Sequence, residues 1–245
     1  MNFTYEGTEI AKLGFEDFCA FLKENGNCKK AEFDKKIIKT QMKIFGFTAR
    51  EIEDFYKYFS KTESNIFTYP ADYCYEITLL QGLLIVKNKA STLAEKRAEF
   101  VDWVSNVDNW AHCDMVCAKF RCRKSEKREL FEFSKELALR DEEFFARSGV
   151  VMLMTFVSEN AEEVFSVLEK VKYGRYYVDM AVAWLCATAL ITRKTETLDF
   201  LNKSDKINDF TYVKSLRKAC ESYRIPDVDK AEYKRLIAER KRQNA

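Results

Sequence analysis

The segment FFARSGVVMLMTFVS, residues 144–158, is apolar around almost its whole circumference when it is drawn as a helix, and it carries one charge, Arg147. A second segment, YYVDMAVAWLCATAL at 176–190, has the same character. Helices that are apolar on all sides must be covered by other helices. The segments 126–138 and 161–171 have one apolar and one charged face. This alternation predicts two layers, with the apolar helices inside and the amphipathic helices outside.

Helical periodicity extends over most of the chain, because apolar residues recur every three or four positions. From residue 109 onward, pairs of helices begin about every 33 residues, a spacing typical of helical repeats. The sequence therefore predicts an all-α fold, an α-solenoid of stacked antiparallel helix pairs curved around a concave groove. A compact irregular helical bundle is the alternative. The expected helices are 8–23, 49–60, 72–88, 92–105, 109–122, 126–138, 142–158, 161–171, 175–192, 196–202, 210–222 and 228–242.

The composition supports this fold. The chain has 245 residues, of which 47% are hydrophobic, and this is enough for a substantial core. It has only 7 Gly and 2 Pro, whereas sandwiches and barrels need many tight turns built from these residues. We expect a single domain over 1–245, with the repeats most clearly defined over 73–230 and the helices of 1–45 least clearly defined.

Charge and cysteine usage restrict the function. The chain has 41 Lys and Arg against 39 Asp and Glu, so a nucleic-acid site would have to be a local patch. The N-terminus has no secretory signal pattern, and the longest uncharged apolar stretch, 180–192, is shorter than the about 18 residues of a membrane span. The eight cysteines are scattered through helical segments and are expected to be reduced. We expect a cytoplasmic monomer with no membrane partner.

A metal site would have to use the one histidine, His112, with the nearby Cys113, Cys117 and Cys122. On a helix, Cys113 and Cys117 share a face, but His112 and Cys122 point elsewhere, and no second cysteine pair completes a tetrahedral shell. The chain also has no glycine-rich phosphate loop. The sequence therefore predicts no metal site and no cofactor.

Trp110 and Asp114, in NWAHCDMVCAKF, are four residues apart and so share one helix face, which Cys117 and Arg121 would continue. A tryptophan beside a carboxylate is an unusual combination for a core stripe. Either the pair forms a functional site, or Trp110 packs in the interior while Asp114 accepts backbone hydrogen bonds from a loop.

The following segment, KFRCRKSEKR at 119–128, has six positive charges against one negative charge. Such a run is either a solvated helix end or a phosphate-binding patch. Its candidate DNA-binding residues are Lys119, Arg121, Arg123 and Lys124. Arg147, isolated in its apolar segment, either pairs with an acid such as Asp179 or lines a groove, because an unpaired buried charge is costly.

Five segments in this order resemble the AlkD-like DNA alkylation repair proteins, HEAT-like repeat solenoids that include DNA glycosylases. The resemblance begins near Phe45 and is strongest over 73–230. The segments are YEITLLQGLLI (75–85), VDNWAHCDMVCAKF (107–120), FFARSGVVMLMTF (144–156), YYVDMAVAWLCATAL (176–190) and KACESYRIPDVDK (218–230).

The resemblance implies an enzyme that hydrolyses the N-glycosidic bond of cationic N3- or N7-alkylated purines in double-stranded DNA. Active members of the family carry a Trp-x-x-x-Asp motif, an Arg on the next inner helix and a Trp on the one after, and these positions are Trp110, Asp114, Arg147 and Trp184 here. By this resemblance Asp114 stabilises an oxocarbenium-like sugar and orients the attacking water. Trp110 and Trp184 pack against the nucleotide, and Arg147 holds a phosphate.

Two alternatives remain open. The family includes members without glycosylase activity, so the chain could be an inert solenoid that binds DNA structures or a protein partner. A helical domain in which Trp110 and Trp184 are both inaccessible is the other alternative. The acidic residues near Arg50, namely Glu51, Glu53 and Asp54, argue against a DNA contact there.

Overall fold

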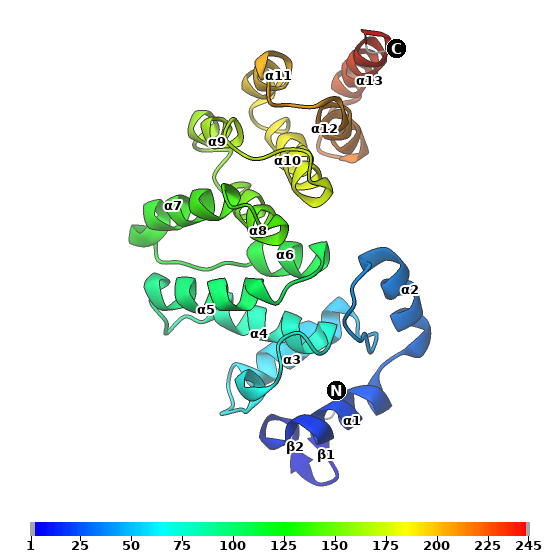
Figure 1. Cartoon of the computed structure of the whole chain (residues 1–245), viewed down its shortest axis with the longest axis vertical. Helices are drawn as coiled ribbons and strands as arrows, with labels where there is room; N and C mark the ends of the chain where they lie inside the picture. Colours follow the sequence, from blue (N-terminus) through cyan, green and yellow to red (C-terminus); the bar gives the residue numbers. More distant parts are fainter. Residues whose placement is uncertain (1–2, 244–245) are drawn as a thin grey trace. The chain divides into compact units, whose positions relative to one another are not determined.

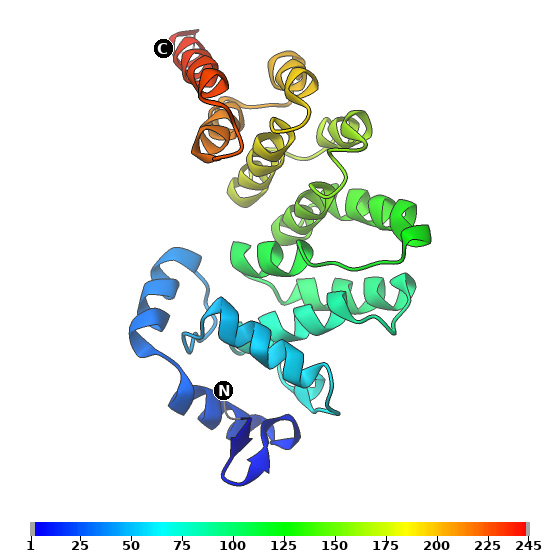
Figure 2. The same cartoon turned by 180° about the vertical axis from the view of Figure 1, so that it is seen from behind.

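A computed structural model describes residues 3–243, and most of these residues are helical (Figures 1 and 2). The predicted all-α fold of a helical repeat solenoid is confirmed. No helix in the described range is both long enough and apolar enough to cross a membrane. The elements are β1 (Thr4–Tyr5), β2 (Thr8–Glu9), η1 (Ile10–Lys12), α1 (Phe15–Asn25), α2 (Cys28–Ile38), α3 (Ala49–Phe59), η2 (Ile66–Thr68), α4 (Tyr75–Lys87), α5 (Leu93–Ser105), α6 (Trp110–Cys117), η3 (Lys124–Glu126), α7 (Lys127–Ala138), α8 (Glu143–Leu153), α9 (Ala161–Leu168), α10 (Tyr176–Ala189), α11 (Lys194–Lys203), α12 (Asp209–Glu221) and α13 (Asp227–Gln243).

The described residues form two compact units, one ending at Lys124 and the other beginning at Ser125. In the second unit, α8, α10 and α12 pack side by side in one layer, and α7, α9 and α11 form the other layer (Figure 1). The two apolar segments of the sequence are α8 and α10, which pack against each other as expected. Each buries most of its surface, and this is why both are apolar on nearly all sides.

The predicted repeat is visible in the hydrogen bonds of the second unit. Several side chains bond to groups that lie 34 or 35 residues away, at the equivalent place in the neighbouring repeat. These bonds join Tyr177 to Glu143, Lys194 to Asp229 and Ser204 to Glu169. Stacked repeats contact their neighbours at a constant sequence separation, so this regularity supports the predicted spacing of about 33 residues.

In the first unit, α4 is the central helix. It packs against α3, α5 and α6, and nearly all of its residues are buried. The helices beside it begin with strong caps, since Thr48 and Thr92 each form a capping box with the glutamate three residues later. Gly82 lets α5 approach α4, because a Cβ at this position would lie 2.6 Å from the ring of Trp103.

Two elements differ from the sequence prediction. A short hairpin, β1 and β2, precedes α1, and the helix α2 lies in a region where none was expected. Ile38 is the only buried residue of α2, so the helix lacks the apolar face by which periodicity is detected. A sequence signal was nevertheless present, because Asn27 caps α2 by accepting a hydrogen bond from the Lys30 amide.

Two helices end five residues earlier than predicted. Helix α6 ends at Cys117 and not near residue 122, because the chain turns there and the Arg121 amide donates to the carbonyl of Val86 on α4. Helix α8 ends at Leu153 and not at 158, where successive amides bond three residues back and tighten the chain into turns. Phe156 and Val157 remain buried in those turns, so their apolar character reflects packing and not a longer helix.

Candidate functional site

Helix α6 presents one partly exposed stripe. Of its eight residues, five are buried, and the partly exposed ones are Trp110, Asp114 and Met115. Trp110 and Asp114 therefore lie one turn apart on the accessible side of the helix, as their spacing predicted. The expected continuation of this face is wrong, because Cys117 is buried and Arg121 lies beyond the end of the helix.

Buried polar residues hold the start of α6 in place. The Asn109 side-chain oxygen accepts from the amide of His112 and caps the helix, while its Nδ2 lies 2.9 Å from His112 Nδ1. His112 Nε2 lies 2.9 Å from the carbonyl oxygen of Tyr75. A carbonyl oxygen can only accept, so Nε2 carries a proton and donates a hydrogen bond to this oxygen. Burial lowers the pKa of His112 to about 4, and the ring stacks on Tyr75. His112 is therefore a neutral structural residue that joins α6 to α4.

Asp108, just before this helix, links α6 to the segment that follows α2. Its carboxylate accepts from the Thr40 hydroxyl at 2.6 Å and from the Gln41 amide at 2.8 Å. Burial alone would raise the pKa of Asp108, but the hydrogen bonds from Thr40, Asn109 and Gln41 lower it. The ionised carboxylate thus holds the C-terminal end of α2 close to the beginning of α6. No local sequence pattern indicates this role of Asp108, because its partners lie 67 and 68 residues away in the chain.

As a result, α2 lies beside Trp110. The Trp110 indole Nε1 donates to the carbonyl of Ile37 at 3.4 Å. The neighbouring side chains of Ile37 and Phe33 are exposed, and α2 carries several lysines. Glu76 supports the loop after α2, because its carboxylate accepts from the amides of Phe45 and Gly46 at 2.9 Å. The surroundings of Trp110 are therefore partly built by a helix that the sequence did not predict.

Arg147 is buried, with 5% of its surface exposed, and its guanidinium donates to the carbonyl of Tyr177 at 2.6 Å. One turn earlier on α8, the Glu143 carboxylate accepts from the Tyr177 amide. Arg147 and Glu143 together fix the first turn of α10. Asp179 is not the ion-pair partner that the sequence suggested, because it accepts hydrogen bonds from Gly174 and Asn208.

Trp184 lies on the partly exposed stripe of α10, together with Tyr177, Met180 and Thr188. Trp110 and Trp184 are thus both partly accessible, and the alternative in which both are sealed in the core is wrong. Trp110 and Asp114 belong to the first unit, and Arg147 and Trp184 belong to the second.

In the basic run at 119–128, residues 119–123 form the connection after α6, Lys124 begins η3, and Lys127 and Arg128 begin α7. Lys119 is paired with Glu53 at 3.2 Å, and Lys87 binds the same carboxylate at 2.8 Å. Burial would raise the pKa of Glu53, but the two lysines lower it. The other three basic residues of the predicted patch have exposed side chains, and they are Arg121, Arg123 and Lys124.

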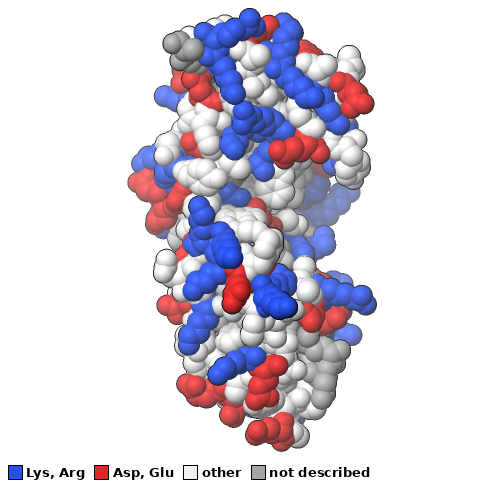
Figure 3. Space-filling view, turned by 90° about the vertical axis from the view of Figure 1, so that its right-hand side faces the viewer, with Lys and Arg blue, Asp and Glu red and all other residues white. Residues whose placement is uncertain are grey.

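Charge is unevenly distributed on the surface. On the face shown in Figure 3, Lys and Arg side chains gather over the C-terminal helices at the top, whereas Asp and Glu are most frequent at the bottom. The balance of +2 for the whole chain therefore hides local differences. Among residues 3–243, no group of three or more His, Cys, Asp and Glu side chains is arranged to hold a metal ion.

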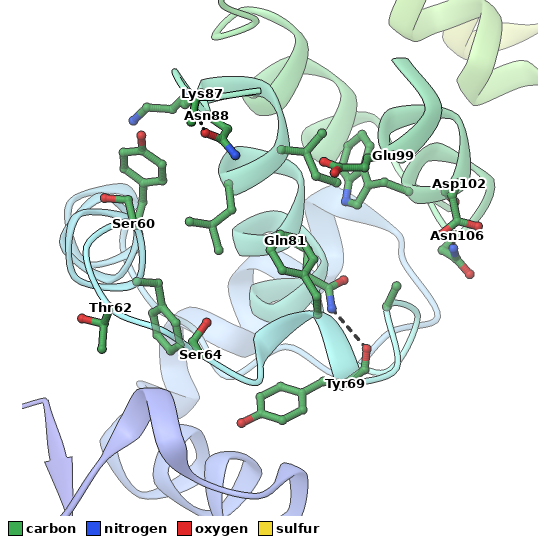
Figure 4. A pocket seen from close by; sticks show the side chains of 18 of the residues that line it. Ser60, Thr62, Ser64, Tyr69, Gln81, Lys87, Asn88, Glu99, Asp102 and Asn106 are labelled. Carbon is green, nitrogen blue, oxygen red and sulfur yellow. Dashed lines mark hydrogen bonds between the residues drawn. The ribbon is translucent and has the colours of Figure 1, made fainter. Parts of the chain in front are cut away.

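A cavity of about 1240 Å³ lies in the first unit between α3, α4 and α5 (Figure 4). Hydroxyl residues of the α3 side face carboxylates of α5 across it, and Gln81 stands between them with its amide bonded to the carbonyl of Tyr69. Glu99, Asp102 and Asp72 are part of its lining. These three carboxylates outnumber the two lysines of the lining, Lys87 and Lys89, and none of the predicted site residues lines the cavity. The cavity is therefore distinct from the candidate site on α6.

Comparison with known proteins supports the family expected from the ordered segments. A search of curated proteins returned no match to the chain. A family model described as DNA alkylation repair enzyme matches residues 20–222, which include α6 with Trp110 and Asp114 and α10 with Trp184. This match covers most of the chain, so the protein belongs to the DNA alkylation repair enzyme family, which assigns it a role in DNA repair with DNA as its partner.

Proposed function

We propose that the protein is a DNA glycosylase that hydrolyses the N-glycosidic bond of cationic N3- or N7-alkylated purines in double-stranded DNA. The observation that carries the proposal is the stripe of α6, where Trp110 and Asp114 are adjacent and partly exposed. The buried contacts of Asp108, Asn109 and His112 hold this stripe rigidly. A preorganised carboxylate beside an indole fits the chemistry of a cationic substrate.

The reaction needs stabilisation of positive charge on the sugar. Alkylation makes the purine a good leaving group, so the base needs little protonation, and positive charge develops at the sugar carbon as the bond breaks. Asp114, as a carboxylate, stabilises that charge and orients the water that attacks the sugar. A well-placed electrostatic group of this kind typically contributes about 3–4 kcal/mol to the transition state.

The tryptophans act on the cationic nucleotide. In the proposal, Trp110 and Trp184 place their ring faces against the sugar and the alkylated base, and each contact contributes about 0.5–2 kcal/mol where water is excluded. Arg147 acts mainly through position, because it is buried and holds the first turn of α10, the helix that carries Trp184. Direct contact between Arg147 and a phosphate would require it to become more exposed.

The exposed connection after α6 carries the side chains that are proposed to contact DNA phosphates. Arg121, Arg123 and Lys124 lie within ten residues of Asp114 in the sequence and have exposed side chains. In the proposal they bind the DNA backbone near the lesion. Lys119 contributes less, because its ammonium group is paired with Glu53 at 3.2 Å.

The direct test is base release from a duplex oligonucleotide that contains a single N7-methylguanine. The wild-type protein should release the base, and Asp114→Asn should lower the single-turnover rate by about 100-fold or more. Asp199→Asn is the matched control, since this carboxylate lies on α11 and pairs with the nearby Lys203. DNA affinity, measured in parallel, should change little in either variant.

Three results would contradict the proposal. If wild-type protein binds the duplex without releasing the base, the alternative hypothesis of an inert solenoid that binds DNA is correct. If Asp114→Asn releases the base at the wild-type rate, the carboxylate has another role. An equal loss in Asp199→Asn would show that the effect is not specific to α6.

A further inference from the structure

Four aromatic rings form a continuous row in the second unit. Phe144, near the start of α8, contacts Tyr177 of α10 with ring centres 5.4 Å apart. Tyr177 contacts Tyr176 at 5.2 Å, and Tyr176 contacts Phe210 of α12 at 5.8 Å. We name these residues the aromatic row. It joins the first turns of three helices that pack side by side in one layer.

The outer half of the row is exposed. Tyr176 exposes 58% of its surface and Phe210 exposes 38%, and among the described residues the other exposed aromatic side chains are Phe33, Phe67 and Tyr223. Packing within the fold does not explain why two adjacent large rings remain in water. Adjacent exposed aromatic side chains indicate a surface that binds a ligand.

Basic residues follow Phe210 on α12. Lys214 lies one turn after Phe210 on α12, with its Nζ 5.6 Å from the ring centre, and Arg217 follows on the same side of the helix. The nearby acids are engaged, because Asp209 pairs with Arg240 and Glu143 accepts from the Tyr177 amide. The first turns of α10 and α12 add the positive ends of two helix dipoles.

We propose that the aromatic row binds unpaired DNA bases, with Lys214 and Arg217 contacting the phosphates of that strand. This inference extends the proposed function. It rests on that function only in taking DNA as the partner, and it does not require glycosylase activity. Rings alternating with cations are the pattern by which proteins bind single-stranded nucleic acid, because every base can stack and every phosphate is negative. A protein ligand would be favoured by a wider apolar surface without this excess of cations.

The position of the row fits this role. Tyr177 and Trp184 are seven residues apart on α10 and both belong to its partly exposed stripe. The row is therefore continuous with the surface that carries Trp184. A base that leaves the helical stack near a lesion would find an aromatic surface there, and this would favour DNA that is already distorted.

The test compares the affinity of the full-length protein for two fluorescent probes, a 12-nucleotide oligothymidine and a blunt undamaged duplex. The double substitution Tyr176→Leu with Phe210→Leu keeps apolar side chains but removes the rings. It should weaken oligothymidine binding by about 10-fold or more, because stacking contributes about 1–3 kcal/mol per base. Duplex affinity should change less than about 2-fold.

Two controls isolate stacking. The conservative pair Tyr176→Phe with Phe210→Tyr keeps both rings and should bind oligothymidine as the wild type does. Phe67→Leu removes a ring of the first unit that is also 58% exposed, and it should have no effect. The thermal unfolding temperature of each variant shows whether the fold is retained, as expected for exposed positions.

The inference is wrong if wild-type protein does not bind oligothymidine, or if the leucine pair binds it with unchanged affinity. It is also wrong if the leucine pair weakens both probes equally, since the row would then contact duplex DNA in general. Base release from the N7-methylguanine duplex is measured separately. Absence of release by the wild type would refute the glycosylase proposal, whereas the oligothymidine result alone decides the role of the row.

Discussion

His112 shows how a single buried residue can control the candidate site. It is fully enclosed, and both ring nitrogens have partners, the Asn109 side chain and the carbonyl of Tyr75. Burial lowers its pKa to about 4, although the hydrogen bond to Tyr75 and the charge of Asp108 act in the opposite direction. The folded protein therefore favours the neutral form of the ring, whose hydrogen bonds hold the first turn of α6 against α4.

This residue should make stability depend on pH. Because the folded pKa of His112 is about 4 and the ordinary value is 6.5, the unfolded chain binds a proton between these values while the folded chain does not. The contribution of the neutral His112 ring to the free energy of unfolding is therefore complete above pH 6.5. It is lost as the pH falls toward 4, and the total loss is about 3 kcal/mol.

The substitution His112→Gln tests this dependence. Glutamine does not titrate, and it can still donate a hydrogen bond toward the carbonyl of Tyr75. Urea unfolding of both proteins from pH 7.5 to pH 4 should show a smaller decline in the free energy of unfolding for the variant. Parallel curves for the two proteins would mean that His112 does not titrate in this range.

At the scale of the helix, α7 and α8 pack unusually closely at Gly149. A Cβ at this position would lie 2.2 Å from the Ala138 amide nitrogen and 2.5 Å from the Ser134 carbonyl oxygen. These are backbone atoms, so they cannot move aside as a flexible side chain could. The close contact sets the position of α8, which through Arg147 also sets the first turn of α10.

Gly149→Ala should therefore destabilise the protein by about 1–3 kcal/mol or more, because overpacking at a rigid contact forces the helices apart. The free energy of unfolding in urea measures this cost. Gly14→Ala is the control, since no atom lies within 4 Å of the position of its Cβ and its cost should stay below about 1 kcal/mol. Equal costs for the two variants would contradict close packing at Gly149.

At the scale of the molecule, affinity for DNA cannot depend on net charge, because 41 basic residues are balanced by 39 acidic ones. It must come from cations that are exposed near the site and are not neutralised by acids. Arg121 and Lys124 are exposed in the connection after α6, whereas Lys203 on α11 is paired with Asp199. Arg121 and Lys124 belong to the predicted DNA-binding patch, and Lys203 does not.

The salt dependence of duplex binding should distinguish these residues. Each lost phosphate contact reduces the slope of log affinity against log salt by about 1. The double substitution Arg121→Ala with Lys124→Ala should therefore reduce the slope by about 2 and weaken binding at low salt. Lys203→Ala should leave both quantities unchanged. If the double variant keeps the wild-type slope, the patch does not contact phosphates.

Local chemistry explains which features could be predicted. The apolar segments that became α8 and α10 were predicted as packed inner helices, since an all-apolar helix can be stable only when it is covered. The spacing of Trp110 and Asp114 correctly predicted one shared helix face. By contrast, α2 has a single buried residue, so its sequence contains little of the periodicity that identifies helices.

By itself, the sequence determined the helical class, the repeat spacing and the face shared by Trp110 and Asp114, because these depend on residues close together in the chain. The tertiary structure decided the partners of Asp108 and Arg147, since Asp108 and Thr40 are 68 residues apart and Arg147 and Tyr177 are 30 residues apart. It also brought Phe144, Tyr176 and Phe210 into one row. Such contacts depend on how helices stack, and no local pattern encodes that packing.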